Sequence, residues 1–327
     1  MTFENKRVLV TGAGGFIGSH LAERLVKEGA NTRAFVHYNA LGSCGWLDIS
    51  PIVNELEVIS GDICDRDSIL SAMKDIDIVF HLAALIGIPY SYHAPVSYVR
   101  TNIEGTLNTL QAARHEEVEL IVHTSTSEVY GSAQFIPIDE NHPLQGQSPY
   151  SATKIGADKI AEAFYLSHGV PVVTIRPFNT FGPRQSLRAV VPTIITQYMS
   201  DQSPKLGNLY PTRDLNFVEN TVDGFILSPN RPEAVGKTIN LGSGREISIG
   251  NLAQLIAQIM GKSIPVTYEK ERSRPEKSEV DRLLADNTTA RKLLGWKPKV
   301  SLEDGLTQTI EWIESNFDRY KKDGYVL

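Results

Sequence analysis

The chain has 327 residues, of which 41% are hydrophobic and 21% are charged, and its formal net charge at pH 7 is −6. This is the composition of a globular protein that is long enough for one large core or two smaller ones. A mildly acidic chain without clustered basic runs argues against nonspecific binding to nucleic acid or to an anionic membrane. It still leaves room for a local basic pocket.

The cysteine content and the apolar runs indicate which kinds of site the chain lacks and in which compartment it is expected. Cys44 and Cys64 are too few for a disulfide framework or a multi-cysteine zinc site, and we expect no metal centre. The first residues lack the long apolar stretch of a signal peptide, and no apolar run approaches the ~20 residues that span a membrane. We therefore expect a cytoplasmic protein that binds neither membrane nor nucleic acid.

Short apolar runs alternate with amphipathic stretches in the first half of the chain. The helical patterns between the runs include Phe16–Glu28 and Val96–His115. This alternation indicates β-α-β units and a parallel sheet, because parallel neighbours need crossover connections. The predicted strands are Arg7–Thr11, Thr32–His37, Glu57–Ser60, Ile76–Leu82, Leu120–Thr124 and Val170–Arg176.

The alternation of apolar runs and amphipathic stretches becomes less regular after about Pro177. There, helical patterns such as Ile249–Met260 and Leu302–Phe317 are separated by irregular loops. We therefore predict an α/β protein with a Rossmann, doubly wound parallel sheet over residues 1–178. A smaller, mixed substrate-binding domain is expected over residues 179–327, with some chain crossing back. No repeat or linker separates the two parts, so we expect them to pack as one body.

A glycine-rich segment, VTGAGGFIGSH, follows the first predicted strand and opens the first predicted helix. Gly12 permits a tight turn, Gly15 lets the backbone approach a pyrophosphate, and Gly18 permits close packing of helix on strand. The helix N-terminus adds N–H donors and the positive end of its dipole. The segment therefore predicts a dinucleotide site, to which Phe16 and Ile17 also belong.

The residues that choose between NAD and NADP depart from the usual pattern. The second predicted strand ends without the acid that binds the adenosine ribose, and no Arg follows for a 2′-phosphate. His37 and Asn39 are the candidates for the ribose, and Asp62 with Ile63 for the adenine. NAD is the predicted cofactor, and NADP stays open. Further expected cofactor contacts are Leu82, Ala83 and Ala84, which follow the fourth apolar run.

Two segments carry candidate catalytic groups. HTSTSEVYG ends the fifth predicted strand, and PYSATK opens a helix in which Tyr150 and Lys154 share one face. An ammonium near a phenol lowers the phenol pKa and makes it a usable proton shuttle near neutrality. Glu128 follows the end of the fifth predicted strand.

Together with the N-terminal glycines, the segments TSTSEVYG, YSATK and RPFNTFGPRQ make the chain resemble an extended short-chain dehydrogenase/reductase acting on nucleotide sugars. The resemblance covers essentially the whole chain and points to the 4,6-dehydratase branch. HLAALIGIPYSYHAP and RPEKSEV are similar to the UDP- and GDP-linked N-acetylglucosamine 4,6-dehydratases of bacterial nonulosonate and 6-deoxy-aminosugar pathways.

The resemblance implies a retained NAD and a reaction in three steps. Tyr150, assisted by Lys154 and Thr126, would take the proton of the sugar C4 hydroxyl while a hydride passes to NAD. Glu128 would then remove the C5 proton as water leaves C6, and the hydride would return to C6. The product is a 4-keto-6-deoxy sugar nucleotide.

One position departs from the dTDP-glucose 4,6-dehydratases, which carry Asp before the catalytic Glu. Here it is Ser127, a pairing that also occurs in GDP-mannose dehydratases and in UDP-glucuronate decarboxylases. The acid for water loss is therefore open between Ser127 and Glu128, and the pair does not separate dehydration from decarboxylation. A 4-epimerase is a further alternative, and so is a non-catalytic NAD-sensing binding protein, although an intact Tyr150 and Lys154 argue against the last.

The diphosphate of a nucleotide sugar favours arginine partners. UDP is the first choice of nucleotide and GDP the second, and the segment Leu85–Tyr92 is expected to contact the hexose. The family commonly forms homodimers, for which Val96–His115 and Ser151–His168 are the candidate faces. The expected substrate residues are Pro89, Tyr90, Asn179, Arg184, Arg188, Arg213 and Arg274.

Overall fold

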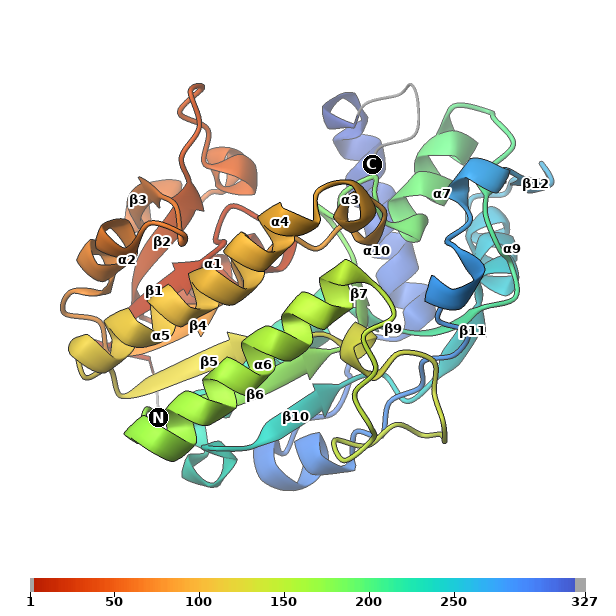
Figure 1. Ribbon diagram of the computed structural model, residues 1–327. Coiled ribbons are helices and arrows are strands. Elements are labelled where there is room, and N and C mark those ends of the chain that lie inside the picture. Colours follow the sequence, from red (N-terminus) through yellow and green to blue (C-terminus); the bar gives the residue numbers. More distant parts are fainter. Residues whose placement is uncertain (1–2, 321–327) are drawn as a thin grey trace.

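A parallel sheet of seven strands runs through the protein (Figure 1), whose computed structural model describes residues 3–320. All of its neighbouring strands are parallel. The strands β1 and β4 each carry a run of three buried apolar residues, as expected where helices cover both faces. In spatial order the strands are β10 (Thr238–Leu241), β6 (Val172–Pro177), β5 (Leu120–Thr124), β4 (Ile78–His81), β1 (Arg7–Thr11), β2 (Asn31–His37) and β3 (Glu57–Gly61).

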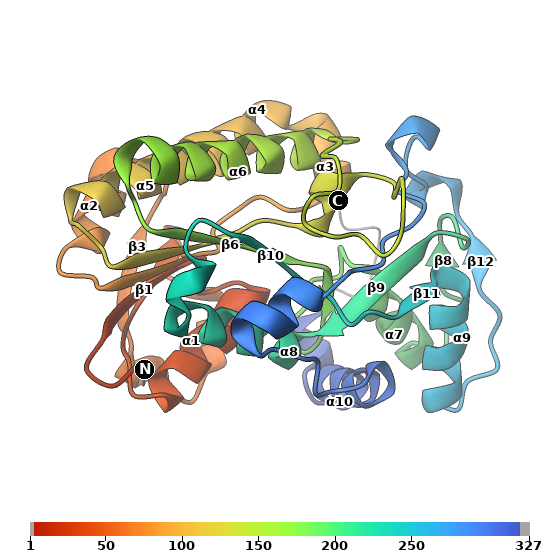
Figure 2. The same cartoon turned by 90° about the horizontal axis from the view of Figure 1, so that it is seen from below.

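Helices cover both faces of this sheet (Figure 2), which confirms the predicted doubly wound Rossmann architecture. The helices on one face are α2 (Arg66–Met73), α5 (Gly105–His115) and α6 (Pro149–His168), and those on the other are α1 (Phe16–Lys27) and α8 (Val218–Leu227).

The helix predicted over Val96–His115 is present with a change of winding inside it. It consists of α4 (Pro95–Tyr98), a π-helical segment (Val99–Glu104) and α5. Wide turns of this kind are frequent at functional sites. The segment lies beside α6, which carries the predicted catalytic pair (Figure 1).

The second half of the chain forms a mixed region at the carboxyl ends of the strands (Figure 2). Its elements are α3 (Ile88–His93, from the first half), α7 (Val190–Met199), α9 (Ile249–Ile259), α10 (Leu302–Ser315), the three-stranded sheet β11-β9-β7 (Glu246–Ser248, Thr212–Phe217, Asn179–Phe181) and the pair β12-β8 (Thr267–Tyr268, Lys205–Leu206).

Residues 218–241 return from the second half to the main sheet. The strand β10 pairs with β6, and α8 packs against α1. Phe80 of β4 contacts Phe225 of α8, and both belong to a buried cluster that also includes Phe217 of β9. The apolar core therefore runs without a break from the sheet into the mixed region. No helix within residues 3–320 is long and apolar enough to cross a membrane.

Candidate active site

The glycine segment forms a close turn between β1 and α1. Gly12 has φ +71°, and a Cβ there would lie 2.9 Å from the backbone N of Ala83. A Cβ on Gly18 would lie 2.2 Å from the carbonyl oxygen of Gly12, so the helix can approach the turn only with glycine. Gly15 is the N-cap of α1 and no side chain caps that helix end. The turn thus leaves the backbone open to a pyrophosphate, with Phe16, Ile17 and Gly18 in the first helical turn.

The loop after β4 forms the adjacent wall of this turn. Leu82 and Ala83 donate their backbone N–H groups to Thr11 Oγ1 at 3.1 and 3.2 Å. Ala84 continues the loop and is half-buried. The Thr11 hydroxyl therefore holds two of the three predicted cofactor contacts, Leu82 and Ala83, against the glycine turn.

His81 orients the Thr11 hydroxyl through a hydrogen bond and has a structural role. Thr106 donates its proton to the carbonyl oxygen of Asn102 at 2.7 Å, so it accepts from His81 Nε2 at 3.1 Å. The other ring nitrogen, Nδ1, then accepts from Thr11 Oγ1 at 2.9 Å. Burial, with the charges of His123 and Lys154, holds the pKa of His81 well below its usual value, in agreement with a neutral ring.

Several residues that were predicted to bind the adenosine half of NAD already bond within the protein or are buried in its core. The Asn39 side chain donates to the carbonyl oxygen of Ser43 at 2.7 Å and accepts from its N–H at 3.2 Å, so it organises its own loop. His37 is exposed at the end of β2. Asp62 accepts from the backbone two residues further on at 2.9 Å, and Ile63 is buried in the core of the sheet.

The predicted catalytic residues of the first segment follow β5 in one tight turn. Thr126 is the N-cap of a 3-10 helix (Ser127–Tyr130), and its hydroxyl accepts from the N–H of Glu128 at 3.2 Å. Ser127 and Glu128 are both buried. A carboxylate is therefore held inside the protein at the carboxyl end of a central strand, where ligands bind in folds of this kind.

Tyr150 and Lys154 begin the helix α6. Ser148 caps this helix by accepting from the N–H of Ser151 at 3.1 Å, and Ser151 Oγ accepts in turn from the N–H of Ser148 at 3.0 Å. This reciprocal cap fixes the first turn of the helix. Tyr150 and Lys154 are both buried on its inner face.

Burial dominates the electrostatics of this pair. Burial raises the pKa of Tyr150, the hydrogen bond with Thr126 opposes this, and the charge of Glu128 adds to it. Burial lowers the pKa of Lys154 to about 8, and its Nζ donates to the carbonyl oxygen of Thr124 at 2.7 Å. The pKa of Tyr150 is thus raised in this structure and not lowered as expected, because desolvation of the phenolate is the largest influence on it.

Two predicted substrate arginines converge on Glu128 from the second half of the chain. Arg274 Nη1 lies 3.6 Å from Glu128 Oε2, and Arg213 Nη2 lies 3.6 Å from Glu279 Oε1. Arg274 Nη1 is buried without a hydrogen-bond partner. Burial lowers the pKa of Arg213, while the charge of Glu128 supports its protonated form. The structure thus joins the predicted acid–base residue and the predicted diphosphate residues in one cluster.

Aromatic rings surround Tyr150 on the side of the predicted hexose segment. The rings of Tyr98 and Tyr150 pack edge to face with centroids 6.3 Å apart, and Tyr90 packs on Tyr98 at 6.2 Å. Pro89 and Tyr90 lie in the short helix α3 (Ile88–His93). The predicted hexose segment is therefore linked to Tyr150, the predicted catalytic tyrosine, through the ring of Tyr98.

The other predicted substrate residues lie in different surroundings. Arg184 pairs with Glu23 at 2.7 Å and donates to Ser19 Oγ at 3.1 Å, so it is bound to α1. Arg188 is exposed and its charge lies near Tyr98. Asn179 begins β7, and its Oδ1 is buried without a hydrogen-bond partner. Arg184 Nε is also buried without a hydrogen-bond partner, but Glu23 holds the guanidinium of Arg184, whereas no hydrogen bond among the described residues engages the Asn179 Oδ1 atom.

Asn102 was missed by the sequence interpretation. Its side chain accepts from the N–H of Leu85 at 2.9 Å, donates to the carbonyl oxygen of Leu85 at 3.0 Å, and donates to Thr153 Oγ1 at 3.0 Å. It therefore joins the hexose segment to the helix of Tyr150. The signal in the sequence was an amide within an otherwise amphipathic helical run.

Gln147 was missed as well. Its Oε1 accepts from the N–H of Ser132 at 2.5 Å, and its Nε2 donates to the carbonyl oxygens of Lys277 and Glu279 at 3.3 and 3.1 Å. It thus holds the segment that follows Arg274 against the start of α6. No residue pattern in the chain marks this role.

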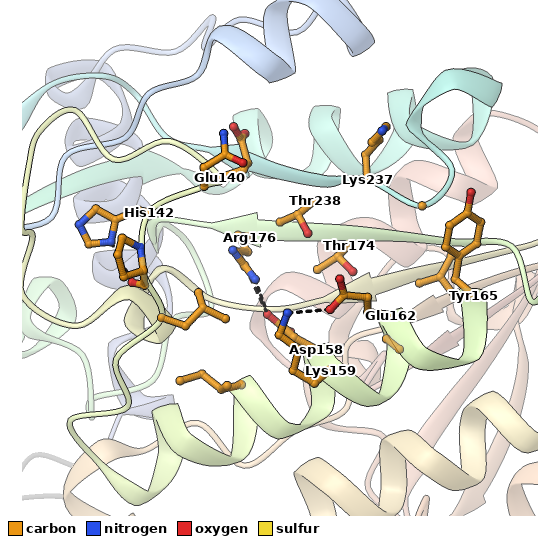
Figure 3. Close-up of a pocket in the computed structure, with 17 residues that line it drawn as sticks. Glu140, His142, Asp158, Lys159, Glu162, Tyr165, Thr174, Arg176, Lys237 and Thr238 are labelled. Carbon is orange, nitrogen blue, oxygen red and sulfur yellow. Dashed lines mark hydrogen bonds and ion pairs between the residues drawn. The ribbon is translucent and has the colours of Figure 1, made fainter. Parts of the chain in front are cut away.

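A cavity of about 490 Å³ lies between α6, the edge strand β10 and its neighbour β6, away from the predicted site residues (Figure 3). Its walls carry two ion pairs, Arg176 with Asp158 at 2.9 Å and Lys159 with Glu162 at 2.7 Å. None of the residues predicted for cofactor or substrate lines it.

Comparison with known proteins places the chain in a family. Residues 9–309 match the family described as GDP-mannose 4,6 dehydratase. The UDP-glucose 4-epimerase of Mycolicibacterium smegmatis is 32% identical, with 94% of this chain and 99% of that protein covered.

Two solved structures share the whole architecture. Epimerase Mth375 of Methanothermobacter thermautotrophicus has a TM-score of 0.89 and 33% identity, with 97% of this chain and 94% of the other covered. DesIV, the dTDP-glucose 4,6-dehydratase of Streptomyces venezuelae with NAD and TYD bound, has a TM-score of 0.88 and 27% identity, with 96% and 99% covered. Dehydratases and epimerases are thus both relatives, and these likenesses do not single out the N-acetylglucosamine dehydratases. The chain belongs to the GDP-mannose 4,6-dehydratase family of extended short-chain dehydrogenase/reductases, the enzymes that dehydrate or epimerise nucleotide sugars.

Proposed function

We propose that this protein is an NAD-dependent 4,6-dehydratase of a nucleotide-linked N-acetylglucosamine, with the UDP sugar as first choice and the GDP sugar as second. The observation that carries dehydration is Glu128, a buried carboxylate beside Tyr150 and paired with Arg274. An epimerase has no step that needs a base at C5. The choice of N-acetylglucosamine rests on the family-like segments around Leu85–Tyr92 and Arg274.

The glycine turn supports NAD as the cofactor. Gly12, Gly15 and Gly18 shape a cradle that a Cβ would fill, and the uncapped end of α1 faces it. Lys154 is the residue expected to hold the nicotinamide ribose. When bound, NAD accepts a hydride from C4 of the sugar and returns it at C6. The structures of the relative DesIV contain NAD, which agrees with this proposal.

The residues of the chain move the protons. Tyr150 removes the proton of the C4 hydroxyl as the C4–H bond breaks, and its hydrogen bond with Thr126 stabilises the resulting phenolate. Lys154, which is buried on the same helix, is proposed to stabilise the phenolate by its charge. Glu128 removes the proton at C5, which the adjacent ketone makes acidic. The C6 hydroxyl leaves as water with a proton from Glu128 or Ser127. After C6 receives the hydride, C5 takes a proton from solvent and Tyr150 releases to solvent the proton that it took from the C4 hydroxyl, so the net change is the loss of one water.

Arg213 and Arg274 are proposed to bind the diphosphate, because a guanidinium matches phosphate oxygens with two parallel hydrogen bonds. The unused Nη1 of Arg274 and the unused Oδ1 of Asn179 are suited to contact the sugar nucleotide. Arg184 is not part of this proposal, because Glu23 already holds it.

Mass spectrometry of the reaction in D₂O tests the proposal. The purified protein is incubated with NAD and, separately, with UDP-N-acetylglucosamine, GDP-N-acetylglucosamine, dTDP-glucose and UDP-glucuronate. Loss of one water with one deuterium at C5 from an N-acetylglucosamine donor supports it. An unchanged mass with inversion at C4 would show an epimerase, loss of carbon dioxide a decarboxylase, and dehydration of dTDP-glucose alone a different sugar.

A homodimer is also proposed, through the helices α5 and α6. Val96, Val99 and Leu166 are exposed apolar side chains on or beside this helical layer. Light scattering after size exclusion tests it, since Leu166→Asp is expected to produce a monomer. A wild-type mass equal to one chain would contradict the proposal.

A further inference from the structure

A buried carboxylate lies one helical turn after Lys154 on the inner face of α6. Asp158 is 5% exposed and is saturated with hydrogen bonds. Its Oδ2 accepts from Ser125 Oγ at 2.6 Å and from Arg176 Nη2 at 2.9 Å, and its Oδ1 accepts from His123 Nε2 at 3.0 Å. The Arg176 contact can be followed in Figure 3.

These contacts join the three elements that meet at the active site. Ser125 directly precedes Thr126 at the end of β5, Lys154 precedes Asp158 on α6, and Arg176 ends the stretch of β6 that leads to Asn179. A shift of α6 relative to β5 would break the Ser125 and His123 contacts together. Asp158 therefore fixes the distance between the turn of Glu128 and the helix of Tyr150.

The charges around Asp158 show why an ionised carboxylate is retained in this place. The facing groups are Lys154 on α6, His123 on β5 with His81 stacked on it, and Arg176 on β6 with the Tyr130 ring over it. Burial alone would raise the pKa of Asp158, but the His123 hydrogen bond and the charges of Arg176 and Lys154 hold it at about 2. The carboxylate is the one nearby charge that opposes the desolvation of Lys154.

We propose that Asp158 is a positioning residue that keeps Lys154 cationic inside the protein and locks α6 to the end of β5. The role matters for catalysis because a neutral Lys154 could not stabilise the Tyr150 phenolate, so this consequence rests on the proposed function. The positive charge of Arg176 neutralises the negative charge of the Asp158 carboxylate. Lys154, Asp158 and Arg176 together therefore carry the positive charge of Lys154 and no net negative charge.

The test measures the titration of Lys154 itself. The full-length protein is labelled at lysine ¹³Cε and ¹⁵Nζ, and the Lys154 resonance is assigned by its loss in Lys154→Arg. In Asp158→Asn we expect this resonance to titrate about 1 to 3 pH units lower than in the wild type, the range for loss of one opposite charge nearby. An unchanged titration would overturn the proposal, whatever substrate the enzyme uses.

Matched variants separate the effect of the Asp158 charge on Lys154 from the effect of the hydrogen bonds that Asp158 accepts. Ser125→Ala removes one hydrogen bond and no charge, so the Lys154 titration is expected to stay in place. Asp158→Glu restores the charge and is expected to bring the titration back toward the wild type. If Asp158→Asn does not fold because Arg176 is left unpaired, Asp158→Asn with Arg176→Gln removes both members of that ion pair, and Lys154, which has lost the carboxylate, is again expected to titrate lower. If Asp158→Glu titrates like Asp158→Asn, charge is not the cause.

Discussion

Arg274 and Glu128 are far apart in the sequence, yet the Nη1 atom of the first lies 3.6 Å from the Oε2 atom of the second. The contact is an ion pair without a hydrogen bond, because Arg274 Nη1 is buried with no hydrogen-bond partner. The arginine therefore stabilises the carboxylate while keeping a donor for another oxygen. One residue can thus serve both the base and a bound diphosphate.

Glu128→Gln is expected to separate the two halves of the reaction. Oxidation at C4 needs Tyr150 and Lys154, whereas removal of the C5 proton needs a carboxylate. Turnover should fall by about 10²- to 10⁴-fold, and NADH should accumulate on the protein, which its absorbance and fluorescence would show. Glu140→Gln is the matched control, since Glu140 is a partly buried acid on the cavity between α6 and β10. Unchanged turnover in Glu128→Gln would remove this residue from the mechanism.

The two arginines Arg274 and Arg184 are expected to behave differently. Arg274→Gln removes a donor for the diphosphate and should raise the KM for the sugar nucleotide by about 10- to 100-fold, the cost of one to two charge-assisted hydrogen bonds. Arg184→Gln leaves the partly buried Glu23 carboxylate without its cationic partner and should lower the free energy of unfolding by about 3 kcal/mol. Urea unfolding and initial rates measured on both variants decide this. A large KM effect of Arg184→Gln at normal stability would contradict the assignment.

The difference between these arginines shows where the sequence is informative and where it is not. The alternation of apolar runs with helical patterns sufficed for six of the seven strands, including β3, which is largely exposed at the edge of the sheet. The seventh, β10, has only four residues and lies among loops of the second half, so no local pattern separates it.

Arg184 and Arg274 look alike in sequence, and only the ion pair with Glu23 shows which one is engaged elsewhere. The same holds for Asn39, whose amide folds back on its own loop.

Gly12→Ala is expected to weaken NAD binding by more than about tenfold. The added Cβ would lie 2.9 Å from the backbone N of Ala83, in a conformation with φ +71° that alanine rarely adopts. Gly42→Ala is the matched control, because Gly42 has φ +64° with nothing within 4 Å of the added Cβ. Fluorescence titration with NAD compares the two. Equal affinities would show that the close approach of the loop at Ala83 is not needed for the cofactor.

His20 is expected to make the protein sensitive to mild acid. It lies on α1 and its Nε2 donates to the carbonyl oxygen of Pro183 at 3.0 Å, which joins the cofactor helix to the loop before Arg184. Burial, aided by the charge of Arg184, lowers the pKa of His20 to about 4.

Between about pH 6.5 and pH 4 the unfolded chain therefore binds a proton at His20 that the folded chain does not. Stability is expected to fall as the pH drops through this window, by up to about 3 kcal/mol from this residue. In His20→Asn that part of the decline should disappear, because asparagine does not titrate. The control is His115→Asn, since His115 is exposed on the surface. Free energies of unfolding in urea across this pH window provide the measurement, and parallel declines in wild type and His20→Asn would mean that His20 does not cause the acid sensitivity.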